Sequence, residues 1–187
     1  MHYEVEQKFP VDDVAAIEAG LVALGARFES AVEQVDRYFA HPSRDFAQTD
    51  EALRIRQTGA QCYVTYKGPK VDPATKTRRE IELPLGGTAE AAAQWTSLLE
   101  ALGFQGVAEV RKRRRPARLA WQGAEIEIAL DRVEGAGTFV EFELPASAEG
   151  LEQARSQILS LAAALGLSNA ERRSYLELLL GGGNRNL

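Results

Sequence analysis

Acidic side chains recur two residues apart at three places in this chain of 187 residues. The pairs are Glu4/Glu6, Glu80/Glu82 and Glu141/Glu143. Carboxylates that converge in a partly buried site repel each other, by about 4 kcal/mol at about 4 Å when the effective dielectric constant is about 20. Converging pairs therefore need cations. An oxygen-only ligand set suits Mg²⁺ or Mn²⁺ better than zinc.

Basic side chains show the same spacing, in Arg54/Arg56 and Lys112/Arg114. Converging cations need a polyanion, and the planar guanidinium of Arg matches the geometry of phosphate. The residues therefore favour a site for a metal–polyphosphate complex. The alternative is that every charged face is solvated, which is the usual state of the polar face of an antiparallel sheet.

A spacing of two residues returns a β-strand to the same face, so strands must position these side chains. The first stretch shows it, because Glu4, Glu6 and Lys8 share one face and mostly apolar residues lie opposite. About eight strands are predicted, near 1–10, 28–40, 53–57, 62–67, 75–85, 105–119, 121–133 and 137–145. Their short connections favour antiparallel pairing. A closed sheet with a charged lining leaves its apolar faces outward, where helices must cover them.

Residues typical of helix starts and helix ends lie between several of the predicted strands and after the last one. Asp12 and Thr88 are predicted N-caps, and the helices that they begin are predicted to stop at Gly25 and Gly103. A third helix is predicted at 151–166. Ser168-x-x-Glu171 has the pattern of a capping box for a short last helix that ends at Leu180. Residues 1–180 then form a single domain, and 181–187 form a disordered tail.

Composition limits the function classes. A net charge of -5 and a pI near 5.2 argue against bulk binding to nucleic acid or to a membrane surface. The basic run 111–115 splits on a strand, so that Lys112 and Arg114 face one way and the other three face the opposite way. Cys62 is the only cysteine, the sequence predicts no signal peptide, and no apolar run approaches the length of a membrane span. These features predict a cytoplasmic protein.

Taken in order, the motifs resemble those of the CYTH domain superfamily. These are the triphosphate tunnel metalloenzymes, which include class IV adenylate cyclases, thiamine triphosphatases and inorganic triphosphatases. The matching motifs are Glu4-x-Glu6-x-Lys8, Asp36-x-Tyr38, Leu53-Arg-Ile-Arg56, Thr65-Tyr-Lys67, Arg78-x-Glu80-x-Glu82, Lys112-x-Arg114, and Leu130-Asp131 through Glu141-x-Glu143. The segment from His41 and the terminal Arg173-Ser-Tyr are most similar to the class IV adenylate cyclase branch.

The resemblance implies an α+β fold, an eight-stranded antiparallel β-barrel that forms a tunnel with helices packed outside. It also implies roles for the residues at matching positions. The implied metal-facing acids, for one or two ions of Mg²⁺ or Mn²⁺, are Glu4, Glu6, Glu80, Glu82, Asp131, Glu141 and Glu143. The implied triphosphate-binding bases are Arg54, Arg56, Lys67, Arg78, Lys112 and Arg114. Lys8 and Tyr38 match a pair that assists the chemistry in hydrolytic members.

The function that the resemblance implies is metal-dependent cleavage of a triphosphate that releases phosphate. Tripolyphosphate, thiamine triphosphate and nucleoside triphosphates are the candidate substrates, and neither nucleic acid nor a membrane is an expected partner. One alternative is an adenylate cyclase that makes cyclic AMP and pyrophosphate from ATP. A second alternative is a polyphosphate-binding module without turnover. The resemblance also allows a homodimer.

Overall fold

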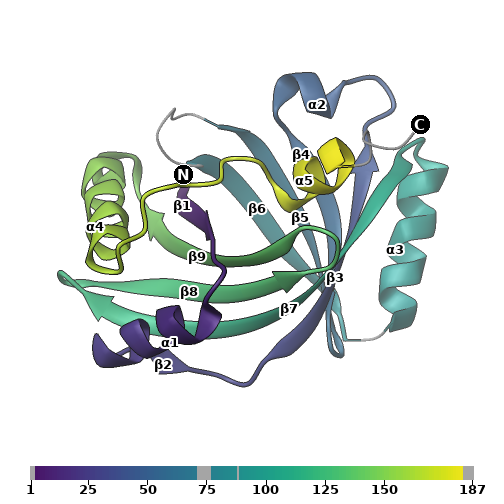
Figure 1. The fold of residues 1–187 in the computed structure, drawn as a ribbon. Coiled ribbons are helices and arrows are strands. Elements are labelled where there is room, and N and C mark those ends of the chain that lie inside the picture. The colour runs from purple at the N-terminus through teal and green to yellow at the C-terminus, as the bar shows by residue number, and fades with distance from the viewer. Residues whose placement is uncertain (1–2, 71–76, 88, 183–187) are drawn as a thin grey trace.

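The structure, a computed structural model, describes residues 3–70, 77–87 and 89–182. In these residues nine strands form one antiparallel sheet, and five α-helices lie outside it (Figure 1). The strands are β1 Tyr3–Pro10, β2 Arg27–Phe28, β3 Val32–Ala40, β4 Ala52–Thr58, β5 Gln61–Lys70, β6 Arg78–Gly86, β7 Gln105–Trp121, β8 Ala124–Val133 and β9 Gly137–Ala146. The helices are α1 Val14–Ala23, α2 Phe46–Thr49, α3 Ala89–Ala101, α4 Leu151–Ala164 and α5 Tyr175–Gly182, with a 3-10 turn at Ala148–Gly150 before α4.

The sheet closes into a barrel. Its strands follow the order β7-β3-β4-β5-β6-β1-β9-β8, and β8 pairs with β7 again. β2 adds a short ninth strand beside β7. In the described residues the seam between β1 and β6 consists of two register pairs, Tyr3 with Arg79 and Glu4 with Arg78. The predicted eight-stranded antiparallel barrel is confirmed.

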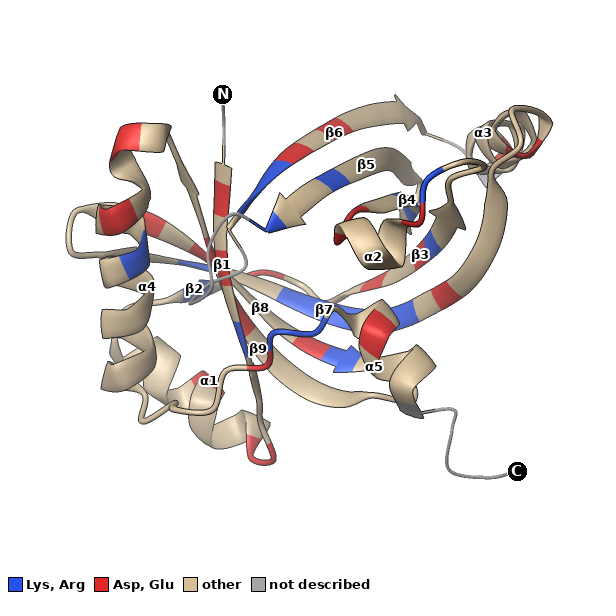
Figure 2. Cartoon of the chain, turned by 90° about the horizontal axis from the view of Figure 1, so that it is seen from above, with Lys and Arg blue, Asp and Glu red and all other residues tan. Residues whose placement is uncertain are grey.

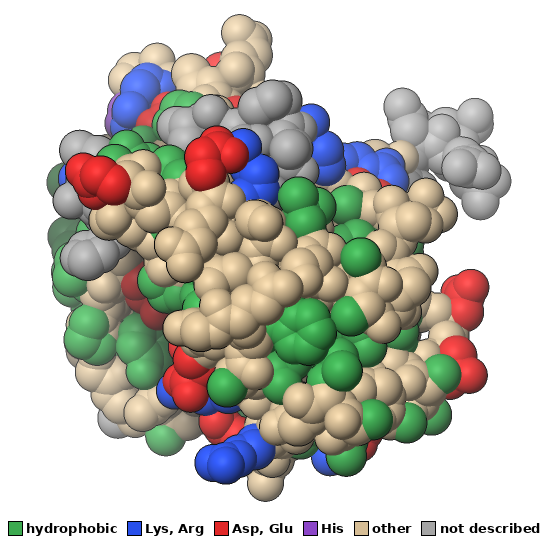
Figure 3. All heavy atoms as spheres, turned by 90° about the vertical axis from the view of Figure 1, so that its left-hand side faces the viewer, with side chains coloured by type: hydrophobic (Ala, Val, Ile, Leu, Met, Phe, Trp, Pro, Cys, Tyr) green, Lys and Arg blue, Asp and Glu red, His purple; other side chains and the backbone are tan. Residues whose placement is uncertain are grey.

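The main hydrophobic core lies outside the barrel wall. Val5, Phe142 and Ile126 point outward from β1, β9 and β8 and pack against Ile158 and Leu161 of α4. Complete burial of each such side chain contributes about 1.5–3 kcal/mol. Figure 3 looks onto the side of the molecule where α1 and α4 lie, and hydrophobic side chains gather near the centre of that face. The helices therefore cover the apolar faces of the strands and leave the barrel interior to polar residues.

A second cluster supports the opposite side of the barrel. Phe39 of β3 and Ile55 of β4 pack against Leu99 of α3. α3 lies on the far side of the molecule from α4 in Figure 1. The strands that carry Asp36, Arg54 and Arg56 are thus held from outside, while their charged residues face inward.

Two predicted helix starts were wrong, because each helix begins later in the sequence than predicted. The first N-cap is Asp13, whose Oδ1 accepts from the Ala16 N–H at 2.9 Å, and not Asp12. The last helix begins six residues later than predicted. The Ser174 hydroxyl accepts from the Glu177 N–H at 3.1 Å, and the Glu177 carboxylate accepts from the Ser174 N–H at 2.5 Å. These two reciprocal hydrogen bonds form a capping box. The last helix is therefore capped at Ser174, and the same pattern at Ser168 does not begin a helix.

Other boundaries also differ from the prediction. The segment 28–40, predicted as one strand, contains the last residue of β2 and the whole of β3. Residues 41–50, which the sequence predicts to be a connection between strands, contain the short helix α2. α5 continues to Gly182, while the rest of the predicted tail, 183–187, lies outside the described residues. The predicted cap Thr88 and the first residues of the 75–85 strand also lie outside them. Among the described helices, none has the length and apolar character that crossing a membrane would require.

Candidate functional site

A cavity of about 980 Å³ occupies the barrel interior and its mouth. All of the predicted site residues except Asp131 line it. The acids are Glu4, Glu6, Glu80, Glu82, Glu141 and Glu143, and the bases are Lys8, Arg54, Arg56, Lys67, Arg78, Lys112 and Arg114, with Tyr38 beside them. Figure 2 shows acidic and basic bands along the strands that surround the interior. The alternative of fully solvated charged faces is therefore wrong for these residues.

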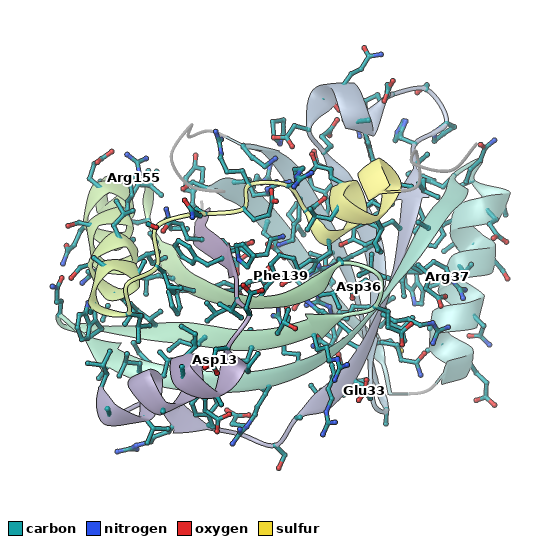
Figure 4. All side chains as sticks on the ribbon, viewed as in Figure 1. Asp13, Glu33, Asp36, Arg37, Phe139 and Arg155 are labelled. Carbon is teal, nitrogen blue, oxygen red and sulfur yellow. The ribbon has the colours of Figure 1, made fainter. Side chains whose placement is uncertain are left out.

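Strand alternation sorts the charges between the two sides of the wall. Asp36 and Arg37 are neighbours on β3, and they point to opposite sides (Figure 4). Asp36 is 1% exposed, whereas the Arg37 side chain is 47% exposed and pairs with Glu109 on the outside. The same rule splits the basic run of β7. Lys112 and Arg114 line the cavity, while Arg111, Arg113 and Arg115 pair with Glu109, Glu33 and Glu18.

Asp36 anchors the two arginines of β4. The Arg56 guanidinium donates to both of its carboxylate oxygens at 2.7 Å, and Arg54 Nη1 donates at 3.4 Å. Burial by itself would raise the pKa of Asp36, but Arg56 and Arg54 hold that pKa well below its usual value. Burial would likewise lower the pKa of Arg54, and Asp36 raises it instead. Both arginines are thus oriented by Asp36 before any ligand arrives.

Lys67 stands between two acids from different strands. Its Nζ lies 2.7 Å from Glu80 Oε2 and 3.5 Å from Glu4 Oε2. Burial raises the pKa of Glu4 well above its usual value, although Lys67 opposes the shift. For Glu80, burial is outweighed by Lys67, and the pKa is lowered to about 2. Of the two acids, Glu4 holds a proton more readily, so Lys67 forms its ion pair chiefly with Glu80.

Asp131 is completely enclosed beneath the cavity wall. Arg114 donates to it through Nε at 2.8 Å and through Nη2 at 2.6 Å, and Lys112 Nζ lies 3.2 Å away. Arg114 Nη2 also contacts Glu141. Burial and the neighbouring Arg114 lower the pKa of Lys112 to about 8. In this arrangement Asp131 positions the basic side chains of Lys112 and Arg114, and the resemblance-implied role as a metal ligand would require these contacts to open.

Lys8 lies on the ring of Tyr175. Its Nζ is 3.9 Å from the ring centroid and donates to the Arg173 carbonyl at 2.6 Å. The Tyr175 hydroxyl donates to Asp131 at 3.0 Å, which links Lys8 to the bases around that carboxylate. Tyr38 also lines the cavity, and it packs in the same cluster as Tyr175. Tyr175 lies in the terminal Arg173-Ser-Tyr motif but was not predicted as a site residue.

Two other buried residues were missed as members of the site. Asp36 shares the inward face of β3 with Tyr38, so strand periodicity alone could have identified it. Thr65, which is fully buried, donates to Glu82 Oε2 at 2.8 Å. Its inward position follows from the same alternation that places Lys67 in the cavity.

A row of acids on neighbouring strands bears on metal binding. Glu6 is the direct register partner of Glu143, and Glu143 is that of Glu127. Like charges directly opposite each other are destabilising unless a cation lies between them. Burial, reinforced by Glu141 and Glu6 and opposed by Arg114, raises the pKa of Glu143 to about 7. These oxygen donors fit a hard divalent cation, although the described residues contain no group of three ligands already arranged around a metal position.

The interior continues beyond this row. A second cavity of about 150 Å³ is lined by Arg118 and Glu29 together with Arg114, Glu127 and Glu143, and the last three line the large cavity as well. Glu127 contacts Arg118 at 3.6 Å and is half exposed, which places it at a rim. The pair of Arg114 and Glu143 therefore lies on the wall that the two cavities share.

The comparisons with known proteins agree in family and in fold. A family model described as CYTH domain matches residues 2–175. The chain is 38% identical over 178 residues to "Putative adenylate cyclase MJ0240" of Methanocaldococcus jannaschii, covering 94% of this chain and 97% of the relative. The PH1819 protein of Pyrococcus horikoshii OT3 has a TM-score of 0.83 at 37% identity over 95% of this chain and 98% of its own. The PH1012 protein of the same organism has a TM-score of 0.78 at 30% identity, over 94% and 99%.

Proposed function

Because the chain belongs to the CYTH domain family, we propose that it is a divalent-metal-dependent enzyme that cleaves a triphosphate and releases phosphate. One observation carries the proposal: acids and bases from strands throughout the barrel converge on a single cavity. Phosphoryl transfer asks the protein mainly for positioning and for neutralisation of charge. A barrel interior with fixed, ionised groups offers both.

Buried carboxylates hold several of the basic side chains in fixed positions, where they can bind a polyanion. Asp36 orients Arg54 and Arg56, and Asp131 orients Arg114. Groups that are already ordered need little reorganisation when the phosphate oxygens arrive, which is where electrostatic catalysis gains its advantage. We assign Arg54, Arg56, Lys67, Arg78, Lys112 and Arg114 to the triphosphate.

The acids are assigned to one or two ions of Mg²⁺ or Mn²⁺. Glu4, Glu6 and Glu143 would hold the ion that accompanies the triphosphate, and Glu141 would hold a second, with Asp131 behind it. Glu80 and Glu82 face the same cavity and complete the acidic side. The chemistry that the ions supply when bound is neutralisation of phosphate charge and a lower pKa for an attacking water.

Lys8 and Tyr38 are assigned to assisting the reaction from the wall. Lys8 is almost fully buried, and the Arg173 carbonyl fixes its ammonium. It therefore contributes a positive charge at a constant place. Tyr38 lies on β3 at the edge of the same cavity, in register with Arg54 of β4. Its hydroxyl can orient an attacking group beside that arginine.

Adenylate cyclase activity is the second candidate, and the name of the M. jannaschii relative favours it. The same bases and acids would hold ATP, because only the attacking group and the bond that breaks differ. Binding without turnover is a third candidate. The three differ in their products, so product analysis separates them.

The test is a panel of tripolyphosphate, thiamine triphosphate and ATP with Mg²⁺ or Mn²⁺, assayed for phosphate, pyrophosphate and cyclic AMP. Arg56→Ala probes the cavity, and Arg37→Ala is the matched control on the outer face of the neighbouring strand. Phosphate release that is lost in Arg56→Ala and kept in Arg37→Ala supports the proposal. Cyclic AMP and pyrophosphate from ATP would replace it with a cyclase, and tight binding without any product would replace it with a binding module.

A further inference from the structure

The segment 41–51 forms part of the wall of the large cavity, and two adjacent acids fasten it to the barrel. Figure 1 shows α2, which lies in this segment, at the same end of the barrel as α5. Glu51, whose side chain is almost fully buried, accepts from the Tyr66 hydroxyl and from Arg44 Nη1 at 3.0 Å. Its neighbour Asp50 makes a separate set of contacts, to β5 and β6. The segment is therefore held at two distinct places.

Asp50 contacts a base that the proposed function assigns to the triphosphate. Its Oδ1 lies 2.8 Å from Lys70 Nζ and 3.9 Å from Arg78 Nη2, and its Oδ2 accepts from the Lys70 N–H at 3.1 Å. Lys70 of β5 and Arg78 of β6 are register partners. Asp50 and Arg78 both line the cavity. A carboxylate of the protein thus lies where a phosphate group would find its own partners.

We propose that Asp50 makes an autoinhibitory contact: it competes with the triphosphate for Arg78 and Lys70, and it releases the end of α2 when the triphosphate binds. The inference rests on the proposed function, because it takes the cavity as the triphosphate site. It adds Lys70 to the bases that meet the ligand. It also makes the attachment of the 41–51 segment depend on whether the cavity is occupied.

The exposure of Asp50 makes its contacts displaceable. Burial would raise the pKa of Asp50, but the hydrogen bonds from Lys70 and the nearby Arg78 lower it, so the carboxylate is charged. Its side chain is 40% exposed, and water therefore screens its ion pairs, whereas Asp36 and Asp131 are enclosed. A triphosphate carries more negative charge than one carboxylate, and its oxygens match the guanidinium group. The ligand is thus the stronger competitor.

The backbone of Asp50 shows which substitution isolates the contact. Asp50 ends α2 in the left-handed conformation, with a φ of 55°, and its N–H donates to the Phe46 carbonyl. Residues with a Cβ rarely adopt this conformation, and Asn and Asp are the ones that tolerate it. Asp50→Asn therefore removes the charge while it keeps the size and the backbone preference of the side chain.

Calorimetry of tripolyphosphate with Mg²⁺ on the full chain tests the competition. Asp50→Asn should raise the affinity by about three- to fivefold, the factor that corresponds to a partly exposed ion pair. Asp45→Asn is the matched control, because Asp45 lines the same cavity on the same segment and its loss removes the same charge. Asp45 accepts from the N–H groups of Ala47 and Gln48 as the N-cap of α2, and Asn preserves that cap. The control should leave the affinity nearly unchanged.

A double variant tests the share of Lys70. Lys70→Met keeps the length of the side chain and removes its charge, so it should weaken the binding of tripolyphosphate. Because the competition for the ammonium group is then gone, Asp50→Asn should raise the affinity less in this background than in the wild type. A full gain in the Lys70→Met background would overturn the assignment of Lys70.

Hydrogen exchange measures the release of α2 directly. Tripolyphosphate with Mg²⁺ should speed the exchange of the backbone amides at 46–51, where the Glu51 N–H donates to the Phe46 carbonyl at 3.0 Å. In Asp50→Asn these amides should already exchange faster without ligand, and the melting temperature should fall. Affinity and stability should thus change in opposite directions, whereas a purely structural Asp50 would lower both when it is replaced.

The outcomes separate this inference from the proposed function. Equal gains of affinity in Asp50→Asn and Asp45→Asn would indicate a general charge effect and would overturn the inference. An unchanged or lower affinity of Asp50→Asn, or slower exchange at 46–51 when the ligand binds, would also overturn it and leave the triphosphate site in place. A wild type that does not bind tripolyphosphate at all would remove the proposed function together with the inference.

Discussion

Lys8 and Tyr175 hold the two ends of the described chain together. The ammonium of Lys8 lies 3.9 Å from the centroid of the Tyr175 ring and donates to the Arg173 carbonyl at 2.6 Å. The backbone carbonyl of Lys8 accepts from the Glu171 N–H at 2.7 Å. One lysine of β1 therefore fixes the segment that leads into α5, and Tyr175 carries that contact on to Asp131.

Removal of the Tyr175 hydroxyl should loosen this connection. Tyr175→Phe keeps the ring over Lys8 but deletes the hydrogen bond to a buried carboxylate, which is worth about 1.5–3 kcal/mol. We expect the free energy of unfolding in urea to fall by that amount. Tyr63→Phe is the control, because its hydroxyl donates to Gln61 at an exposed site. Equal, small effects of the two variants would show that the Asp131 contact contributes little.

Lys112 and Arg113 provide a matched pair on β7. They are adjacent in sequence, but Lys112 lines the cavity and Arg113 points to solvent near Glu33. Lys112→Ala should weaken triphosphate binding by about 10- to 100-fold, because a charge-assisted phosphate contact is worth about 1.5–3 kcal/mol. Arg113→Ala should change the affinity by less than about twofold. Calorimetry at constant ionic strength measures both, and a similar loss in the two variants would indicate a general charge effect instead of a cavity contact.

Asp36→Asn should be strongly destabilising. The substitution leaves Arg54 and Arg56 without their buried counter-charge, a situation that costs about 3–5 kcal/mol. The folded-state pKa of Asp36 is lowered, so its contribution is complete above the unfolded pKa of about 4 and is lost as the pH falls below that value.

Urea unfolding of the wild type and of Asp36→Asn between about pH 7 and pH 3 should therefore show a difference that is constant at first and then shrinks. Glu109→Gln serves as the control, since it removes an exposed partner of Arg37 and should cost no more than about 1 kcal/mol. A difference that grew on acidification would contradict the assigned direction of the pKa shift.

The Glu6/Glu143 pair predicts a metal effect on stability. Without divalent cations, Glu143→Gln should keep or slightly raise the melting temperature, because like charges directly opposite each other cost about 0.2–1 kcal/mol. With Mg²⁺ at about 100 times its dissociation constant, the wild type should gain about 2.7 kcal/mol. The variant should gain much less.

Thermal unfolding in EDTA and at several Mg²⁺ concentrations measures this prediction. Glu125→Gln is the control, since Glu125 lies at the beginning of β8, where its side chain is 63% exposed and pairs with Arg118. If wild type and Glu143→Gln respond identically to Mg²⁺, the ion does not use this carboxylate.

Local sequence periodicity was sufficient to assign most of the site. A spacing of two residues fixes which face of a strand a side chain occupies, so the cavity positions of Arg54, Arg56, Lys112 and Arg114 followed from the sequence. The eight-stranded barrel followed from the same periodicity and from the family motifs. Periodicity does not reveal which acid meets which base across strands, because that depends on the register.

The relationships that the sequence did not predict are long-range. Asp131 lies on the predicted face but is enclosed by Arg114, Lys112 and Tyr175, which come from two other elements. Lys8 meets a residue 165 positions away, the Arg173 carbonyl. The capping box at Ser174 was missed because an equally acceptable local pattern precedes it. In each case several arrangements satisfy the local sequence pattern equally well, and tertiary packing determines which of them forms.

The narrow seam between β1 and β6 has a consequence for biosynthesis. β1 pairs along its whole length with β9, from Tyr3 with Ala146 to Pro10 with Phe139, and touches β6 through two register pairs in the described residues. Of the nine described strands, the first to be synthesised must therefore wait for the last before it gains its principal partner. Until then Glu4 and Glu6 lie on an unpaired edge, and contacts so distant in sequence form slowly. The acidic side of the cavity is thus assembled only after β9 has been synthesised.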